Sequence, residues 1–190
     1  MWEDNVARFN EIDSKYGDGD HGVTIGKIVA AIRHAVAEGA GQPVKAFLAD
    51  LGGAVMAVGG GSAGPLYGTL FEGLGDGLDA AATTVGPAEV RAMLGSCQAA
   101  MAAITKARVG DKTMMDALIP AVAAGESAVG DIPEVLQAAA QAAADGAQAT
   151  AQMVSKFGRA RSYGDQTLGT PDAGALSTAL LFQGLAAGLD

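Results

Sequence analysis

Residues 13–24 read Asp-Ser-Lys-Tyr-Gly-Asp-Gly-Asp-His-Gly-Val-Thr, and this stretch decides how the rest of the chain is interpreted. Three carboxylates, from Asp13, Asp18 and Asp20, lie close together in sequence, with glycines between them that let the backbone turn tightly. Carboxylates this close repel one another unless a cation lies between them, and oxygen ligands suit a hard ion such as Mg²⁺ or Ca²⁺. The stretch therefore predicts a metal site.

A helical pattern begins directly after the aspartates. The first turn of a helix offers unpaired N–H groups and the positive end of its dipole, and both favour an anion. Metal ligands followed by such a helix start are typical of a site for a metal–phosphate pair. The alternative, an acidic surface loop in which Asp20 only caps the helix, stays open. The apolar residues that share one face of this helix are Ile25, Ile28, Val29 and Ile32.

Composition predicts one helical domain over residues 1–190. Alanine and glycine are abundant and aromatic residues make up only 5% of the chain, which favours closely packed helices. The formal charge of −9 argues against a nucleic acid partner, although a bound metal would still allow a small anion. Cys97 is the single cysteine and no apolar run is long enough to span a membrane, so we expect a cytoplasmic protein with no membrane partner.

Apolar spacing predicts an all-α fold, an antiparallel up-and-down barrel or bundle of eight helices. In that arrangement the connections before the second, fourth, sixth and eighth helices lie at one end, and these four carry the distinctive glycine-rich sequences. Each of these helices follows a residue suited to capping: Asp20, Ser62, Thr113 and Asp172. The eight helices are expected over residues 2–15, 21–38, 43–58, 63–77, 87–107, 113–127, 132–157 and 172–188.

Several polar residues near this end have two interpretations. His21 either donates a hydrogen bond to a phosphate oxygen, which we favour, or orients Asp20. Lys112, Arg159 and Arg161 are the cations available there. Ordinary solvated charge explains all three, and Arg159 is the best candidate for a ligand contact because it leads into the last connection of this end.

Four motifs in fixed order make the chain resemble the L subunit, or C-terminal domain, of dihydroxyacetone kinase, from Ile12 through the final helix. They are Ile-Asp followed by Gly-Asp-Gly-Asp-His-Gly at 12–22, Gly-Gly-Ser-Ala-Gly-Pro-Leu-Tyr-Gly at 60–68, Gly-Asp-Lys-Thr-Met at 110–114 and Asp-Ala-Gly-Ala at 172–175. The resemblance implies an eight-helix antiparallel barrel that binds ADP or ATP at one end through two Mg²⁺ ions.

The resemblance also implies roles for individual residues. Asp13, Asp18 and Asp20 would be the magnesium ligands. The residues along the phosphates would be His21, Gly22, Val23, Thr24, Ser62 and Ala63. Thr113 and Met114 would border the adenine, and Arg159, Asp172, Ala173 and Gly174 would close over the nucleotide. The family commonly has Asn in place of Thr24, Ala-Ser at 62–63, Glu-Arg at 165–166 and Pro in place of Ala173.

The implied reaction is transfer of a phosphoryl group to dihydroxyacetone or a similar short ketose that is held on a separate K-type subunit. The donor is either free ATP or an M-type subunit of a phosphotransferase system. The choice between these donors, the identity of the ketose and self-association as a homodimer stay open. Two other classes also stay open: a non-catalytic docking module for a transcription regulator, and a purely structural helical bundle.

Overall fold

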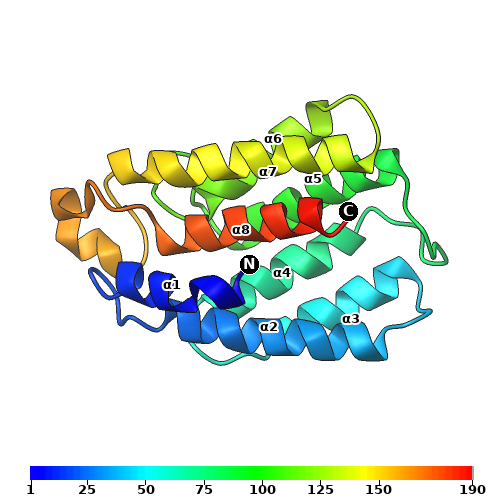
Figure 1. Ribbon diagram of the computed structural model, residues 1–190, viewed down its shortest axis with the longest axis horizontal. Coiled ribbons are helices and arrows are strands. Elements are labelled where there is room, and N and C mark those ends of the chain that lie inside the picture. The colour runs from blue at the N-terminus through cyan, green and yellow to red at the C-terminus, as the bar shows by residue number, and fades with distance from the viewer. Residues whose placement is uncertain (190) are drawn as a thin grey trace.

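The computed structural model describes residues 1–189, and all regular structure in that range is helical (Figure 1). Eight α-helices run up and down, which confirms the predicted all-α antiparallel architecture. They are α1 (Val6–Asp13), α2 (His21–Glu38), α3 (Val44–Met56), α4 (Ala63–Gly75), α5 (Pro87–Ile104), α6 (Met115–Ser127), α7 (Ile132–Ala149) and α8 (Ala173–Ala187). Three 3₁₀ segments complete the described elements: η1 (Glu3–Asn5), η2 (Thr150–Gln152) and η3 (Arg159–Thr167).

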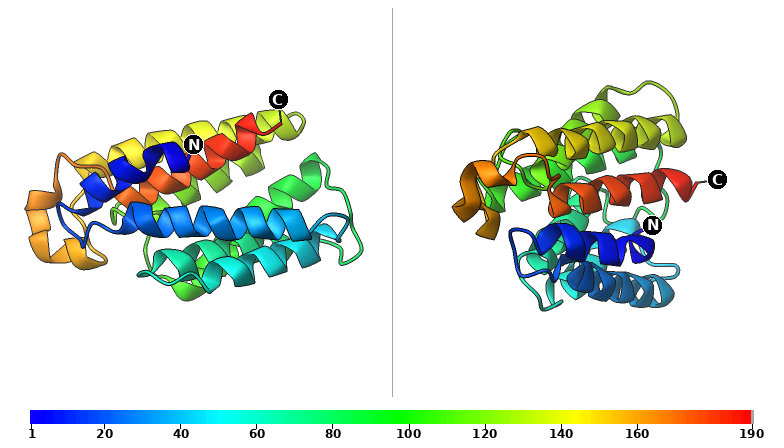
Figure 2. Two further views of the ribbon diagram at one scale, coloured as in Figure 1. Left: turned by 60° about the horizontal axis from the view of Figure 1, so that its bottom comes forward. Right: turned by 60° about the vertical axis from the view of Figure 1, so that its left-hand side comes forward.

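Helix α8 closes the arrangement. Its sequence carries no charged residue, and its buried residues extend from Ala173 to Phe182. It packs against α7, α6, α1 and α2, and Figures 1 and 2 show it between α1 and α7. The buried side chains include Phe9, Ile25, Tyr67 and Leu118. Between these larger groups α7 contributes mainly alanines, so neighbouring helix backbones approach closely, as the composition predicted.

The predicted seventh helix was too long. We expected it to run from 132 to 157, but α7 ends at Ala149, and the backbone at Met153 has an extended conformation. A contact from outside the segment occurs at this end. The Nζ of Lys112 donates a hydrogen bond to the carbonyl of Thr150, the first residue after α7. Helix propensity depends only on the residues within 132–157, so it could not predict that a lysine from another loop would contact this segment.

Smaller differences occur at other ends. The predicted first helix (2–15) is divided into η1 and α1, and the sixth begins at Met115 instead of 113. Segment η3 lies within the connection predicted between the seventh and eighth helices. Of the four predicted caps, the carboxylate of Asp172 accepts the Ala175 N–H at 2.8 Å, while Asp20 and Ser62 occupy N-cap positions without a side-chain capping bond. The prediction of Thr113 was wrong by one residue, because the N-cap of α6 is Met114.

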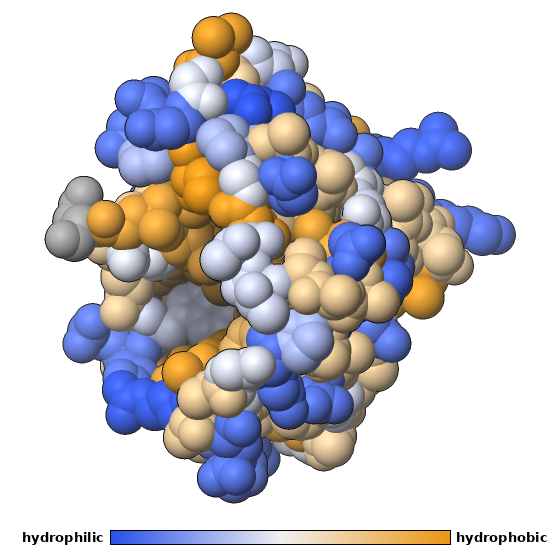
Figure 3. Space-filling model, turned by 90° about the vertical axis from the view of Figure 1, so that its right-hand side faces the viewer, coloured by the Kyte–Doolittle hydropathy of each residue, from blue (hydrophilic) through white to orange (hydrophobic). Residues whose placement is uncertain are grey.

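The two ends of the barrel differ in character. The glycine-rich connections lie at the left of Figure 1, beside η3. The opposite end is hollowed, and apolar side chains gather around the hollow (Figure 3). None of the helices in residues 1–189 combines the length and the hydropathy that a membrane-spanning segment requires.

Candidate functional site

A cavity of about 540 Å³ opens at the end that carries the glycine-rich connections. Four helices, α2, α4, α6 and α8, begin at this cavity, as the up-and-down arrangement predicted. Their first residues, His21, Ala63, Met115 and Ala173, all line it. Because the N-terminal turn of a helix presents free N–H groups and partial positive charge, the cavity favours an anionic ligand.

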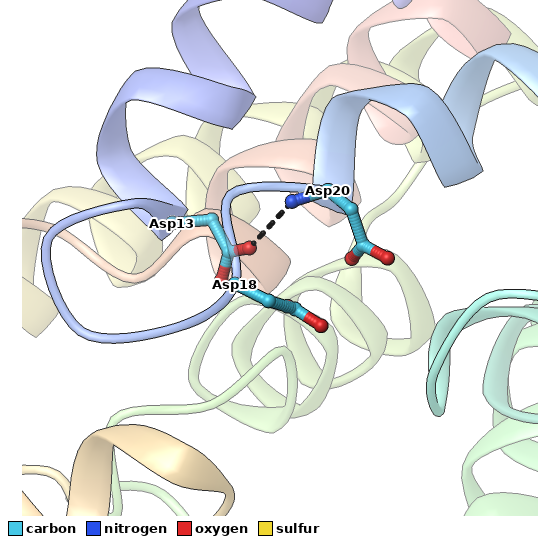
Figure 4. Close-up of side chains that lie close together, drawn as sticks. All are labelled: Asp13, Asp18 and Asp20. Atoms are coloured by element: carbon cyan, nitrogen blue, oxygen red, sulfur yellow. Dashed lines mark hydrogen bonds between the residues drawn. The ribbon is translucent and has the colours of Figure 1, made fainter.

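The three aspartates of the opening sequence lie together (Figure 4), and all three line this cavity. One carboxylate oxygen from each of Asp13, Asp18 and Asp20 lies within 4.8 Å of those from the other two. Asp13 is the last residue of α1, and its Oδ2 accepts the backbone N–H of Asp20 at 3.1 Å. Opposite oxygen ligands of Mg²⁺ are about 4.2 Å apart, so small side-chain rotations would bring the three into range. The donors and their spacing fit a hard divalent cation.

The turn that carries these aspartates depends on Gly17. A Cβ added at this position would lie 2.4 Å from Asp13 Oδ1. Any larger residue would therefore displace the carboxylate that also orients Asp20. The glycines of this stretch thus hold the aspartates close together as well as allowing the turn.

Segment η3 lies over the turn between α1 and α2. Arg159 Nη1 donates a hydrogen bond to Asp18 Oδ1 at 2.9 Å, and the hydroxyl of Tyr16 donates to the Gln166 carbonyl at 2.5 Å. The rings of Tyr16 and Tyr163 meet edge to face with centroids 5.3 Å apart. The guanidinium of Arg159 therefore lies beside the aspartates, where an anion bound to a metal at this place would be within its reach.

His21 is only partly available to a ligand. Its Nε2 lies 2.9 Å from the Ser177 hydroxyl on α8, and its ring packs edge to face on Phe9. Burial lowers the pKa of His21, while the carboxylates of Asp13 and Asp20 oppose that shift. The favoured interpretation, a hydrogen bond to a phosphate oxygen, is thus restricted to the ring nitrogen that Ser177 does not use.

Most of the other predicted nucleotide residues line the cavity, but two do not. Thr24, Ser62, Thr113, Met114, Arg159, Asp172 and Gly174 line it, together with Ala63 and Ala173. Gly22 and Val23 lie outside it. Gly22 packs against the α1 backbone, and the Val23 N–H donates to Asn10 Oδ1 at 3.2 Å, so these two residues join α2 to α1.

The sequence reasoning missed the residues that shape the loop before α6. Lys112, which was considered either as an available cation or as ordinary solvated charge, is only 4% exposed, and Asp116 is 1% exposed. The carboxylate of Asp116 accepts the N–H of Gly110 at 2.6 Å and that of Thr113 at 2.7 Å. The spacing Thr-Met-Met-Asp at 113–116, an acid three residues after a possible cap, was the signal available for Asp116.

Asp172 at the start of α8 is half-buried, and its carboxyl interacts electrostatically with Lys112. Burial raises the pKa of Asp172 to about 6, and the hydrogen bond from Ala175 and the Lys112 ammonium oppose this shift. Burial likewise lowers the pKa of Lys112, with Asp172 and Asp116 opposing. The two groups thus share a poorly hydrated environment at the wall of the cavity.

The raised pKa of Asp172 predicts that its contribution to stability falls as pH rises. In the unfolded chain this carboxyl ionises near its ordinary value of 3.8, but in the folded chain only near 6, so the folded state binds more protons in between. Relative to Asp172→Asn, which keeps a capping acceptor, the wild type should lose up to about 3 kcal/mol of unfolding free energy from pH 4 to pH 7. Urea denaturation at several pH values measures this difference, and parallel curves would contradict it.

Comparison with known proteins gives the following similarities. The family model for the DAK2 domain matches residues 15–187. The L-erythrulose kinase of Pectobacterium atrosepticum is 36% identical over 98% of this chain and 32% of its own length. The D-erythrulose kinase of Mycolicibacterium smegmatis is 39% identical over 93% of this chain and 31% of its own length. The chain thus spans about a third of these relatives.

Shorter relatives and solved structures agree. The ADP-binding subunit DhaL of the PEP-dependent dihydroxyacetone kinase 2 of Listeria innocua is 32% identical over 90% of this chain and 80% of that subunit. The crystal structure of the dihydroxyacetone kinase of C. freundii superposes with a TM-score of 0.75 at 29% identity, covering 98% of this chain and 32% of that one. Its complex with AMP-PNP and Mg²⁺ gives a TM-score of 0.69 at 27% identity.

Proposed function

The chain belongs to the DAK2 domain family, and from that premise we propose that it is the nucleotide-binding part of a kinase for dihydroxyacetone or a similar short ketose. In this proposal ADP or ATP binds in the cavity with two Mg²⁺ ions. The ketose is held by a separate K-type subunit or domain. Erythrulose, the substrate named for two of the similar kinases, is a short ketose of the same class as dihydroxyacetone.

One observation carries the proposal: three carboxylates converge in the lining of a cavity into which four helices point their N-terminal turns. A cavity that attracts both a divalent cation and an anion suits a metal–polyphosphate ligand. The named relatives support the same ligand, because one is described as ADP-binding and one solved structure contains AMP-PNP and Mg²⁺.

The residues at the site would have different roles in binding the nucleotide. Asp13, Asp18 and Asp20 would hold Mg²⁺, which when bound offsets phosphate charge and orients the transferred phosphoryl group. Arg159, now paired with Asp18, is positioned to contact phosphate oxygens beside the metal. Thr113 and Met114 would border the base, in a part of the wall that also includes Ala107 and Met115.

The lengths of the relatives support a K-type partner. The erythrulose kinases are about three times as long as the matched region, whereas the DhaL subunit has nearly the same length. We therefore propose a K-type partner, either separate or fused.

The phosphoryl donor would be either ATP that exchanges freely or an M-type phosphotransferase protein. Tightly retained ADP in the purified chain would point to the M-type donor, and free exchange would point to ATP. A homodimer would appear as a doubled mass in light scattering.

Metal dependence is the first prediction from this function. Titration calorimetry of the chain with ADP should give a dissociation constant at least about tenfold lower with Mg²⁺ than with EDTA. A tenfold change requires only about 1.4 kcal/mol of binding free energy from the contacts between metal and phosphate. An equal dissociation constant with and without metal would contradict the metal assignment. No binding under either condition would leave the structural bundle as the remaining interpretation.

A second assay separates a kinase from a docking module for a regulator. The chain is mixed with a K-type subunit, dihydroxyacetone or erythrulose, and ATP, and the phosphorylated ketose is measured. Turnover supports the kinase. Metal-dependent ADP binding without turnover, either with ATP or with an M-type donor system, would favour the regulatory module instead.

A further inference from the structure

Lys112 has an unusual backbone conformation and an unusual environment. Its φ angle is +60°, and among residues 1–189 no other non-glycine residue has a positive φ. Residues other than glycine rarely adopt a positive φ. They keep it when surrounding contacts hold them there, and such residues concentrate at functional sites. The ammonium group of Lys112 is also buried, which is costly for a charge unless it is well paired.

The ammonium group joins three separate segments. From the loop before α6, Lys112 Nζ donates hydrogen bonds to the carbonyls of Thr150 and Thr170. Thr150 follows directly after α7, and Thr170 lies two residues before Asp172, the N-cap of α8. The carboxylates of Asp172 and Asp116 act electrostatically on this ammonium group and oppose the lowering of its pKa by burial. Lys112 therefore connects the end of α7 and the start of α8 to the start of α6.

Thr150 makes a second connection between the same segments. Its hydroxyl accepts the backbone N–H of Asp172 at 2.8 Å and donates to the Ala147 carbonyl at 2.5 Å. Thr150 itself is fully buried and lies outside the cavity lining. Its carbonyl and its hydroxyl thus both hold the residues that begin α8.

The residues that Lys112 and Thr150 hold in place form part of the cavity wall. Thr113 and Met114 follow Lys112 directly, and Ala173 and Gly174 follow Asp172. A Cβ added at Gly174 would lie 3.6 Å from Met114 Cβ, so the start of α8 lies close to the residues just before α6. A shift of α8 along its axis would therefore change the width of the cavity at this place.

We propose that Lys112 and Thr150 are positioning residues: together they fix the start of α8 against the loop before α6, and nucleotide affinity depends on that link. The inference rests on the proposed nucleotide-binding function. Neither side chain needs to touch the nucleotide for this role, since Lys112 acts through Thr170 and Thr150 acts through the Asp172 N–H.

The test uses a matched pair at one buried position. Thr150→Val keeps the volume but removes the hydroxyl, whereas Thr150→Ser keeps the hydroxyl. The dissociation constant for Mg²⁺–ADP, measured by calorimetry, should rise about tenfold in Thr150→Val and stay within about twofold in Thr150→Ser, as expected for one buried hydrogen bond. Lys112→Met should raise it further, and Lys156→Met, which removes an exposed lysine that pairs with Asp111, should not change it.

Hydrogen–deuterium exchange separates local positioning from a general loss of stability. In Thr150→Val, peptides that cover 110–116 and 170–176 should exchange faster, while those that cover 21–28 stay as in the wild type. Faster exchange throughout the barrel, or unchanged exchange at 170–176 with unchanged affinity, would overturn the proposal. If Lys112→Met does not fold, the comparison of Thr150→Val with Thr150→Ser still tests the proposal. If the wild type binds no nucleotide, the proposed function fails, and the exchange pattern still reports whether the link exists.

Discussion

Replacing Asp20 or Asp18 by alanine is expected to lower turnover of the complete kinase by about a thousandfold while the fold persists. A factor of this size corresponds to about 4 kcal/mol, in the range that metal ions contribute to phosphoryl transfer. Asp20→Ala is the cleaner change, because the backbone N–H that orients Asp13 remains, whereas Asp18 also pairs with Arg159. Removing one of three mutually repelling charges should leave the melting temperature equal or slightly higher.

The measurement combines ketose phosphorylation in the presence of a K-type partner with circular dichroism of the isolated chain. Asp50→Asn is the matched control, since it removes an exposed carboxylate from α3. It should keep wild-type turnover. Normal turnover in Asp20→Ala would refute the assignment of this residue as a magnesium ligand. A loss of helix content in parallel with turnover would mean that the aspartate acts on folding.

Two glycines one helical turn apart on α2 should respond to alanine with opposite signs. A Cβ at Gly22 would lie 2.1 Å from the carbonyl oxygen of Val6, whereas a Cβ at Gly26 meets nothing within 4 Å. Gly22→Ala must therefore push α1 away from α2, and overpacking against backbone costs about 1–3 kcal/mol or more. Gly26→Ala should instead stabilise by about 0.5–1 kcal/mol, because glycine is a poor helix residue.

Urea denaturation of both variants measures these effects. The consequence for function is also specific, because α1 carries Asp13: Gly22→Ala should weaken metal-dependent ADP binding, while Gly26→Ala should not. If Gly22→Ala left stability unchanged and only lowered nucleotide affinity, Gly22 would be a direct phosphate contact, as the family resemblance implied. Equal effects of the two substitutions would contradict the close approach of α1 and α2.

The grouping of the candidate site was available from the sequence because it depends on local spacing and on helix direction. Asp13, Asp18 and Asp20 are so near in sequence that a single glycine-containing turn brings them together. Antiparallel helices with short connections place every second loop at the same end, which is why the four motifs meet at one cavity. Both arguments need only the sequence and the geometry of helices.

The sequence could not predict contacts between distant segments. Nothing near Lys112 indicates that its ammonium group binds carbonyls at Thr150 and Thr170, or that α7 ends at Ala149, directly before this contact. Likewise, the helical spacing around Gly22 does not show which helix lies against it. Such contacts depend on which surfaces meet after the helices pack.

The amino-acid sequence alone was enough to predict the all-helical class, the direction of the helices and the acidic, glycine-rich end of the barrel. These follow from residue periodicity and from short connections, which are local properties. The tertiary structure decided which side chains are buried there, where α7 stops, and which residues of the His21–Thr24 run reach the cavity. The physical reason is that burial and hydrogen bonding of Lys112, Thr150 and Asp172 depend on neighbours far away in the chain.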